Sequence, residues 1–468
     1  MELGLISLLP PLLAIFLAIF SRQVYLSLAA GLWLGYSILS GGNPAAGLRE
    51  TVDALVSVLG SAGDARVVIF TLVVGALIAV MEKGNGVKGF IDWVEHKRWV
   101  NSEKSCQWLA WLLGLVIFIE SNITMLVAGA VSRPLFDRFK VSREKLAYIV
   151  DSTSAPVCIL IPLNAWGAFN VGLLQNLGDT SALQTFINAI AYNFYAYGAV
   201  LLVAVSIFFG FDFASMRKAQ RRTQDGQVLW PGATPLVEPE VLAAAEEGPR
   251  PRARNMVIPI VAMIMMMPLG LYITGDGDLS AGSGSTSILW ASLFGVAVAW
   301  IMLLTQRAMS LNDLMRHSLQ GAGGLLPVAL VLVLALALGD LTDSMGTGAY
   351  VAGAVGDFLP RPALLPVIFL VAGAMSFSIG SSWGTFAIMV PIAVPMAVAL
   401  ELPVAPFLAA VLSGGIFGDH ASPISDTTVV ASMASATDHI DHVRTQMPYA
   451  LFMGGLSALA FFVVGLSL

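Results

Sequence analysis

The sequence predicts an all-α protein that crosses a membrane many times and contains two inverted repeats, each with a re-entrant hairpin and a broken helix. Three observations support this: an apolar composition, apolar runs along the whole chain, and a polar pattern that occurs twice. Of the 468 residues, 57% are hydrophobic and 12% are charged, and the mean hydropathy is +0.81. This charged share is about half of that in soluble domains.

Long apolar runs recur from one end of the chain to the other. Their lengths suit a hydrocarbon core of about 30 Å, which a helix of about 20 residues spans. The first run lacks a basic segment before it and continues, after Ser21–Gln23, into a second apolar run. We therefore expect it to be retained rather than removed as a signal peptide. The clearest runs are Leu3–Phe20, Val67–Met81, Met256–Ile273 and Pro448–Leu466.

Lys and Arg residues gather in four hydrophilic stretches, which the positive-inside rule places in the cytoplasm. The stretch Gly275–Ser285 contains no Lys or Arg and is expected outside. With these assignments we expect about ten spanning segments and both termini outside. The four basic stretches are Lys83–Lys104, Arg133–Lys145, Arg217–Arg254 and Arg307–Arg316.

The apolar stretch Cys106–Val131 lies between two stretches that are both expected in the cytoplasm. A polar interruption at Ile119–Thr124 leaves each arm too short to span the membrane. We therefore expect a hairpin that enters the membrane and returns, with two short ordinary helices as the alternative. Non-helical backbone at that depth is tolerated only inside protein or beside water.

Three short patterns recur in the same order in the two halves of the chain. Because the expected topology runs the first half inward where the second runs outward, the halves are expected to be inverted copies. This arrangement is typical of secondary transporters, whose site lies at the repeat interface. The matched pairs are Val80–Gly84 with Asp343–Gly346, Ile119–Thr124 with Gly380–Thr385, and Asp151–Pro156 with His420–Ser425.

The repeats divide the chain into five expected units. Residues 1–66 form N-terminal scaffold helices, 67–210 the first repeat, 211–255 a cytoplasmic linker, 256–320 further scaffold helices and 321–468 the second repeat. The linker is rich in Pro, Gly, Ala and charge, which favours a mobile segment over a folded domain.

Each half contains a polar cluster at an expected helix break, where proline leaves backbone carbonyls without their partners. Freed carbonyls and hydroxyls offer the oxygen ligands that a hard cation such as Na⁺ prefers. Helix packing and interhelical hydrogen bonding are the alternative for single Ser and Thr residues. Matched positions in the two halves favour cation binding. The expected ligands are Ser152, Thr153, Ser154, Asp419, Ser422, Ser425, Asp426 and Thr427.

Ionisable residues within a membrane are functional candidates by default. Asp419 or Asp426 could bind Na⁺ when ionised and release it on protonation. Asp151 and His420 are candidates for proton coupling or pH sensing, because an unperturbed histidine titrates near pH 6.5. The alternative for His420 is that it caps or pairs with a neighbouring Asp.

A further polar set suits an organic solute better than a bare ion, because it joins uncharged amides to an aromatic ring. A Trp near a span is, however, most often an interface anchor. The candidate substrate-binding residues are Glu120, Ser121, Asn122, Asn164, Trp166, Ser381 and Ser382.

Several function classes lack support in the sequence. No GxxxxGK[ST] phosphate loop occurs, so nothing indicates an ATP-driven pump. Cys106 and Cys158 are expected to be small buried residues. The pairs Asp438-His439 and Asp441-His442 could hold a metal in a membrane-embedded enzyme, but we expect a solvated turn there. We expect no enzyme activity, no transition metal, no covalent cofactor and no nucleic-acid partner.

The segment Gly418–Thr428, followed by Asp438–Gln446 and Pro448-Tyr449-Ala450, resembles the signature of the NhaC-type Na⁺/H⁺ antiporters of the ion transporter superfamily. With the first-half matches, the resemblance covers the chain from Val67 to its end. By position, Asp419, Ser422, Ser425, Asp426 and Thr427 match the second-half motif, and Ser152, Thr153, Ser154 and Pro156 match its first-half partner.

This resemblance implies a multi-pass protein of a bacterial inner (plasma) membrane that uses Na⁺ as its coupling ion and exchanges it for H⁺. It also implies a homodimer within the lipid bilayer and an elevator-like movement of a transport part beside a scaffold. The solute stays open, because the family includes Na⁺-linked exchangers of malate and lactate and members thought to carry amino acids. Na⁺/H⁺ antiport is the leading hypothesis; a Na⁺-driven symporter or exchanger of a small amino or organic acid is the alternative.

Overall fold

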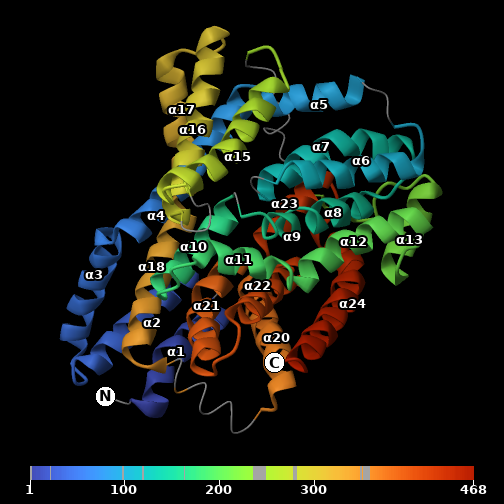
Figure 1. Cartoon of the computed structure of the whole chain (residues 1–468). Helices are drawn as coiled ribbons and strands as arrows, with labels where there is room; N and C mark the ends of the chain where they lie inside the picture. The colour runs from blue at the N-terminus through green and yellow to red at the C-terminus, as the bar shows by residue number, and fades with distance from the viewer. Residues whose placement is uncertain are drawn as a thin grey trace.

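The structure, a computed structural model, is helical throughout the part of the chain that it describes (Figure 1). The described residues are 3–21, 23–96, 100–118, 121–162, 164–235, 249–277, 282–347, 350 and 359–468. The prediction of an all-α membrane protein is confirmed.

The N-terminal helices lie against the start of the second half. Helix α2 contacts α1, α3 and α18. Helix α3 begins at Pro44, and the Asn43 side chain accepts hydrogen bonds from the backbone N–H groups of Ala45 and Ala46. A proline at the first helical position after an Asn cap is a strong start signal. The bounds are η1 Gly4–Leu8, α1 Leu9–Ser21, α2 Val24–Leu39 and α3 Pro44–Gly60.

A long helix, α4 (Ala62–Lys83), connects this region to a separate helical group at the top of Figure 1. There α4 packs against α16 and α17. The backbones of α4 and α17 approach so closely that a Cβ at Gly321 would overlap the main chain of Gly75. The other bounds here are α5 Gly86–His96, α15 Arg254–Thr274, α16 Gly284–Thr305 and α17 Leu311–Gly324. Helix α18 (Leu326–Ser344) follows α17 and packs against α2, α10 and α21.

The first half continues with a helical hairpin and a broken helix. Helices α6 (Glu103–Val116) and α7 (Ser121–Arg138) pack against each other, and both contact α8 (Arg143–Ser152). After α8 the chain breaks at residues 153–154, resumes as the short α9 (Ala155–Cys158) and breaks again before α10. The remaining bounds are α10 Ala165–Asn176, α11 Ala182–Ile190, α12 Phe194–Phe209 and α13 Ala214–Gln224.

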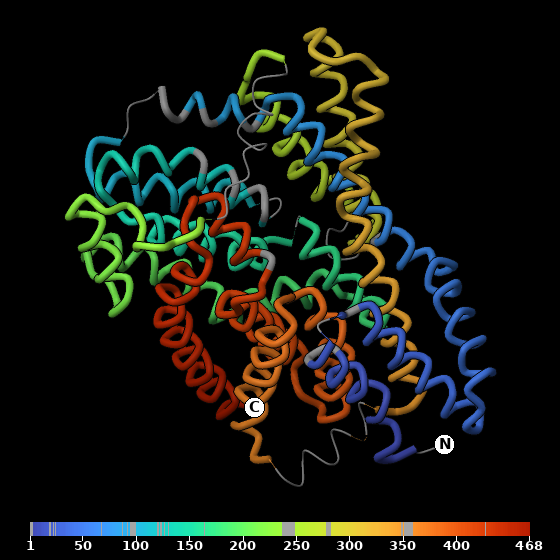
Figure 2. The backbone as a smooth tube through the Cα atoms, turned by 180° about the vertical axis from the view of Figure 1, so that it is seen from behind, coloured from blue at the N-terminus to red at the C-terminus, as the bar shows by residue number. Residues whose placement is uncertain are grey.

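The second half has the same order of elements. Helices α20 (Arg361–Ile379) and α21 (Ser382–Ala399) form a hairpin, and α22 (Val404–Ala421) and α23 (Asp426–Ser435) are separated by a break at residues 422–425. Helix α24 (His439–Gly465) follows. In Figures 1 and 2 the end of α24 and helix α1 lie at the lower end of the molecule, opposite α5 and the α16–α17 connection. The inverted relation of the halves stays a prediction.

Eight helices are long and apolar enough to cross a membrane, or nine if the bent pair α11–α12 forms one span. This count covers only the described residues and rests on length and composition. The expected number of ten spans stays a prediction. Helices α20 and α21 belong to the eight, whereas α6 and α7 do not, so the two hairpins differ in character. The eight are α4, α15, α16, α18, α20, α21, α22 and α24.

Residues 211–255, which are expected to form a mobile linker, contain a packed helix, α13. Helix α13 lies against α8 and α24. Arg222 of α13 makes two hydrogen bonds, of 2.6 and 3.0 Å, to the Glu144 carboxylate, and both side chains are buried. Lys145 pairs with Asp212 at 2.8 Å. Two buried ion pairs therefore hold this part of the linker against α8.

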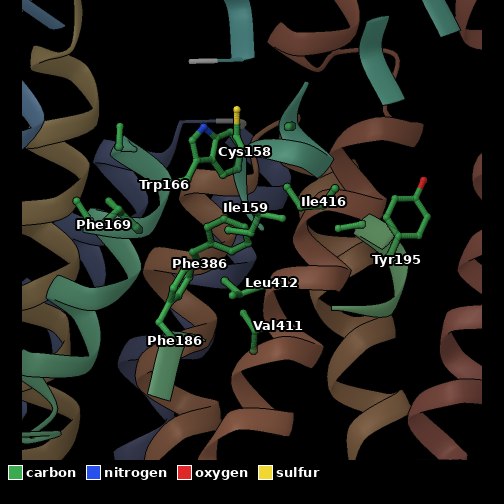
Figure 3. Close-up of a cluster of buried hydrophobic side chains, with 14 of the residues drawn as sticks. Cys158, Ile159, Trp166, Phe169, Phe186, Tyr195, Phe386, Val411, Leu412 and Ile416 are labelled. Carbon is green, nitrogen blue, oxygen red and sulfur yellow. The ribbon is translucent and has the colours of Figure 1, made fainter. Parts of the chain in front are cut away.

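Aromatic side chains fill the contact between the two halves. The ring centroid of Trp166 in α10 lies 4.5 Å from the ring centroid of Trp383 in α21 and 6.0 Å from that of Phe386. Figure 3 shows Trp166 and Phe386 within a buried cluster that includes Cys158 and Leu412. Cys106 and Cys158 are both buried, as expected from the sequence.

Candidate functional site

A buried carboxylate, Asp419, lies in the last turn of α22 within a cluster of hydroxyl groups. It is 1% exposed. The Ser382 hydroxyl donates to its Oδ2 at 3.0 Å, and the Ser425 hydroxyl donates to its Oδ1 at 2.7 Å. Thr427 Oγ1 lies 2.9 Å from Ser425 Oγ. We call Asp419, Ser382, Ser425 and Thr427 the oxygen cluster.

The helix break before α23 explains how these groups meet. Ser425 caps α23, and its Oγ accepts a hydrogen bond from Thr428 N–H at 3.4 Å. Ser382 begins α21, directly after the hairpin tip. Gly380 at that tip has φ +72°, and a Cβ there would lie 2.6 Å from the Ile424 carbonyl oxygen. The hairpin tip can approach the break this closely because residue 380 is glycine.

A second buried group of polar side chains surrounds Asp151 of α8. Gln446 Nε2 donates to Asp151 Oδ2 and to the His420 carbonyl oxygen, both at 2.6 Å. His442 Nε2 lies 3.4 Å from Asp151 Oδ2. Asp151 is 1% exposed and His442 is fully buried. One helix from the second half of the chain, α24, therefore supplies both partners of a first-half carboxylate.

His420 extends this group toward α12. Its Nε2 lies 3.0 Å from the Ser152 hydroxyl, and its Nδ1 lies 2.7 Å from the Tyr195 hydroxyl. We call the six residues the histidine network: Asp151, Ser152, Tyr195, His420, His442 and Gln446. Within the described residues, His442 Nδ1 and Gln446 Oε1 are buried and lack a hydrogen-bond partner. These two atoms are free to bind a further polar group.

Several hydroxyls of the expected cation site face the backbone instead. Thr153 Oγ1 donates to the Ile149 carbonyl and Ser154 Oγ donates to the Asp151 carbonyl. Ser422 Oγ donates to the Phe377 carbonyl of the hairpin α20–α21. Short Ser and Thr side chains commonly satisfy nearby backbone carbonyls in this way. In this conformation the three hydroxyls help to hold the helix breaks.

The candidate substrate residues are spread over three places. Ser382 belongs to the oxygen cluster, and Ser381 caps α21 by accepting from Gly384 N–H. Asn164 caps α10 and donates from Nδ2 to the carbonyls of Phe118 and Cys158, so its amide is fully used. Trp166 packs against Trp383.

Three members of the candidate sets have side chains outside the described part of the structure. Glu120 lies outside the described residues, as do the side chains of Asn122 and Asp426. The backbone of Asp426 starts α23, and Ser121 is a buried residue at the start of α7.

The expectation of a solvated turn around His439 and His442 is wrong. His442 is fully buried against Asp151. His439 Nε2 lies 2.6 Å from the Pro423 carbonyl oxygen, and its Nδ1 lies 3.0 Å from Ser432 Oγ. The spacing of His442 and Gln446 was an available signal, because residues four apart share one helix face. No group of three or more His, Cys, Asp or Glu residues in the described chain could hold a metal ion.

Asp438, just before α24, provides the cap of that helix. It accepts hydrogen bonds from the backbone N–H groups of Ile440, Asp441 and Thr234. Partial burial acts to raise the pKa of this carboxyl, but the hydrogen bonds outweigh it and lower the pKa below its usual range. The charge of Asp438 therefore ties the linker to the start of α24.

Comparisons with known proteins place this geometry in context. The model of the Na⁺/H⁺ antiporter family matches residues 157–466. An uncharacterized protein of Haemophilus influenzae is 32% identical over 484 residues, which covers 98% of this chain and 90% of that protein. A malate-2H⁺/Na⁺-lactate antiporter of Bacillus subtilis is 31% identical over 179 residues, which covers 36% of each chain.

The fold also resembles a solved transporter structure. The YdaH transporter of Alcanivorax borkumensis, which has an unusual topology, superposes with a TM-score of 0.56. The match covers 89% of this chain and 88% of that one, at 14% sequence identity. At this identity the likeness concerns the fold alone.

Proposed function

Because the chain belongs to the Na⁺/H⁺ antiporter family, we propose that it is a Na⁺-coupled secondary transporter that exchanges Na⁺ for H⁺ by alternating access. The observation that carries this proposal is the buried Asp419 carboxylate with hydroxyl groups on both of its oxygens. A carboxylate and several hydroxyls at a helix break form the kind of site that binds Na⁺ in secondary transporters.

In this proposal the oxygen cluster holds the sodium ion. When Na⁺ enters, the hydroxyls of Ser382, Ser425 and Thr427 rotate their protons away and present lone pairs, while Asp419 supplies the negative charge. Asp426, at the start of α23, is a further candidate ligand. Ser152, Thr153, Ser154 and Ser422 support the site by holding the helix breaks.

Protons act at two places. Protonation of Asp419 removes the charge that holds Na⁺, so the two cations compete for one carboxylate. Asp151 and His420 form the proton-coupling group, with His442 and Gln446 as additional members. Asp419 of the oxygen cluster and His420 of the histidine network are neighbours in α22, so this helix connects the two protonation sites.

We further propose that the protein resides in a bacterial inner membrane as a homodimer and moves its substrate part in an elevator-like manner. The hairpins and broken helices form the moving part. The helices α1–α3 and α15–α17 form the scaffold.

A Na⁺-driven symporter or exchanger of a small amino or organic acid is the alternative. It is favoured by the similarity to the relative from Bacillus subtilis, a malate-2H⁺/Na⁺-lactate antiporter. In that case Ser381, Ser382 and the ring of Trp166 are the candidate solute contacts. Asn164 is a weaker candidate because its amide already serves the backbone.

Purified protein in liposomes with an internal pH dye tests the main proposal. A Na⁺ gradient should drive proton movement across the liposome membrane, whereas a K⁺ gradient in medium free of Li⁺ should not. The absence of any Na⁺-dependent proton flux would overturn the proposal. His442→Gln should change the pH dependence of the flux while leaving the apparent KM for Na⁺ near that of the wild type.

A thermal-shift screen of small acids and amino acids, each with and without Na⁺, separates the two candidate functions. A solute that stabilises the protein only in the presence of Na⁺ supports the alternative. Stabilisation by Na⁺ alone, with no effect of any solute, supports the antiporter.

A further inference from the structure

A cavity of about 610 Å³ lies between helix α13, the segment after it and the first turns of α24. Its volume falls within the range of about 300–1,000 Å³ that small-molecule sites occupy. The wall residues that carry the argument are Ser215, Lys218, Trp230, Asp441, Arg444 and Thr445. None of them belongs to the oxygen cluster or the histidine network, so the cavity is a separate feature.

The wall contains two cations, Lys218 and Arg444. Among the described residues, no carboxylate oxygen lies within 4.0 Å of the side-chain nitrogens of Lys218 or Arg444. Other basic residues of this region, Lys145 and Arg222, are paired with acids. Among the described wall residues, Lys218 and Arg444 face one carboxylate, that of Asp441.

The aromatic wall residue, Trp230, packs against a fixed cation. The Arg222 guanidinium lies 4.8 Å from the centroid of the Trp230 ring. Arg222 itself is fixed by Glu144 and by the carbonyls of Gln227 and Val228. Trp230 is therefore a pre-positioned ring rather than a free surface side chain, which lowers the entropy lost when a ligand packs on it.

We propose that this cavity binds a nucleotide, meaning an anion that joins a phosphate to a flat aromatic base. Lys218 and Arg444 would bind the phosphate through charge-assisted hydrogen bonds. Trp230 would pack against the base, because stacking on an aromatic side chain tolerates any base. The Asp441 carboxylate would accept a hydrogen bond from a ribose hydroxyl or a base amino group.

The position of the cavity connects ligand binding to the interior. Asp441, Arg444 and Thr445 lie on the same two turns of α24 as His442 and Gln446, which contact Asp151. Ser215 donates to the Arg444 carbonyl at 2.9 Å, so α13 already touches these turns. A ligand that joins α13 to α24 therefore restrains the helix that carries half of the histidine network.

Isothermal titration of the full-length protein in detergent with AMP, GMP, CMP and UMP tests the proposal independently of transport. At least one nucleotide should bind, and Lys218→Gln and Arg444→Gln should each weaken it by about tenfold or more, as expected for loss of a charge-assisted hydrogen bond of about 1.5–3 kcal/mol. Arg221→Gln, an exposed charge on α13 outside the wall, should leave affinity unchanged.

Hydrogen exchange locates the site. Protection on nucleotide addition should appear in α13 and in the first turns of α24. Absence of binding by all four nucleotides would overturn the proposal, as would equal affinity for inorganic phosphate alone. Protection elsewhere, or an Arg221→Gln effect as large as that of Lys218→Gln, would show that the nucleotide binds another surface.

Discussion

The substitution Asp419→Asn tests the proposed sodium site most directly. Asparagine has nearly the same size, so the surrounding helices need not move. In the folded protein, Ser382 and Ser425 donate one hydrogen bond to each carboxylate oxygen. After substitution one hydroxyl must turn to accept from the new amide, so the loss in stability should be about 1 kcal/mol.

The loss in sodium affinity should be far larger. With an effective dielectric constant of about 20, two unit charges about 4 Å apart attract each other by about 4 kcal/mol. A bound ion would lie closer than this to a liganding carboxylate. Removal of the Asp419 charge should therefore raise the apparent KM for Na⁺ by about a thousandfold or abolish transport.

Na⁺-driven proton flux in liposomes measures this effect, with circular dichroism melting as the check on folding. Asp340→Asn is the matched control, because Asp340 is a partly buried carboxylate of α18 that also accepts a hydrogen bond, from Asn176. Wild-type flux and KM in Asp419→Asn would refute the assignment. An equal loss in Asp340→Asn would show that the effect does not depend on the oxygen cluster.

Three further predictions concern the parts that hold the site. Glu144→Leu leaves Arg222 buried without its partner and should lower the free energy of unfolding by about 3–5 kcal/mol. The double variant Glu144→Leu with Arg222→Met should melt at a higher temperature than Glu144→Leu alone. A double variant that is no more stable than the single one would contradict this reasoning. Gly380→Ala should destabilise the hairpin tip by at least about 1–2 kcal/mol, because φ is +72° and the added Cβ meets Ile424. In contrast, a Cβ at Gly455 has open space, so Gly455→Ala should stabilise α24 by about 0.5–1 kcal/mol. Because the pKa of Asp438 is lowered in the folded protein, its charge should stabilise the structure above its unfolded pKa of about 3.9 and lose that effect as pH falls through the folded value. Thermal melts of Asp438→Asn against the wild type should thus differ at pH 7 and converge in acid, and a constant difference would exclude this role.

Local sequence patterns predicted the helix breaks because proline and short hydroxyl residues act on the backbone next to them. Ser425 meets Asp419, and Thr427 meets Ser425, because all three lie within nine residues around one break. The same local preference explains why the sequence identified Thr153 and Ser154 as polar residues at a helix break but did not predict which way their hydroxyl groups point. Each hydroxyl can contact either a bound ligand or a nearby backbone carbonyl, and in this conformation each donates a hydrogen bond to the carbonyl.

The partners of the histidine network could not be predicted from spacing along the chain. Tyr195 meets His420 across 225 residues, and Gln446 meets Asp151 across 295. Such contacts depend on how the two halves pack, which one sequence does not encode as a short motif. For His442 the lack of a nearby Cys or third His in the sequence favoured a solvated turn over a metal site, but the packing of α24 against α8 buries it.

The last turn of α22 presents two neighbouring side chains to two different groups. Consecutive residues of a helix point about 100° apart, so Asp419 faces the hydroxyls of Ser382 and Ser425 while His420 faces Ser152 and Tyr195. A rotation of this single turn changes both sets of contacts at once. Thermodynamic reciprocity then applies: if occupancy at Asp419 alters the affinity for a proton beside His420, that proton alters the affinity for the ion by the same factor.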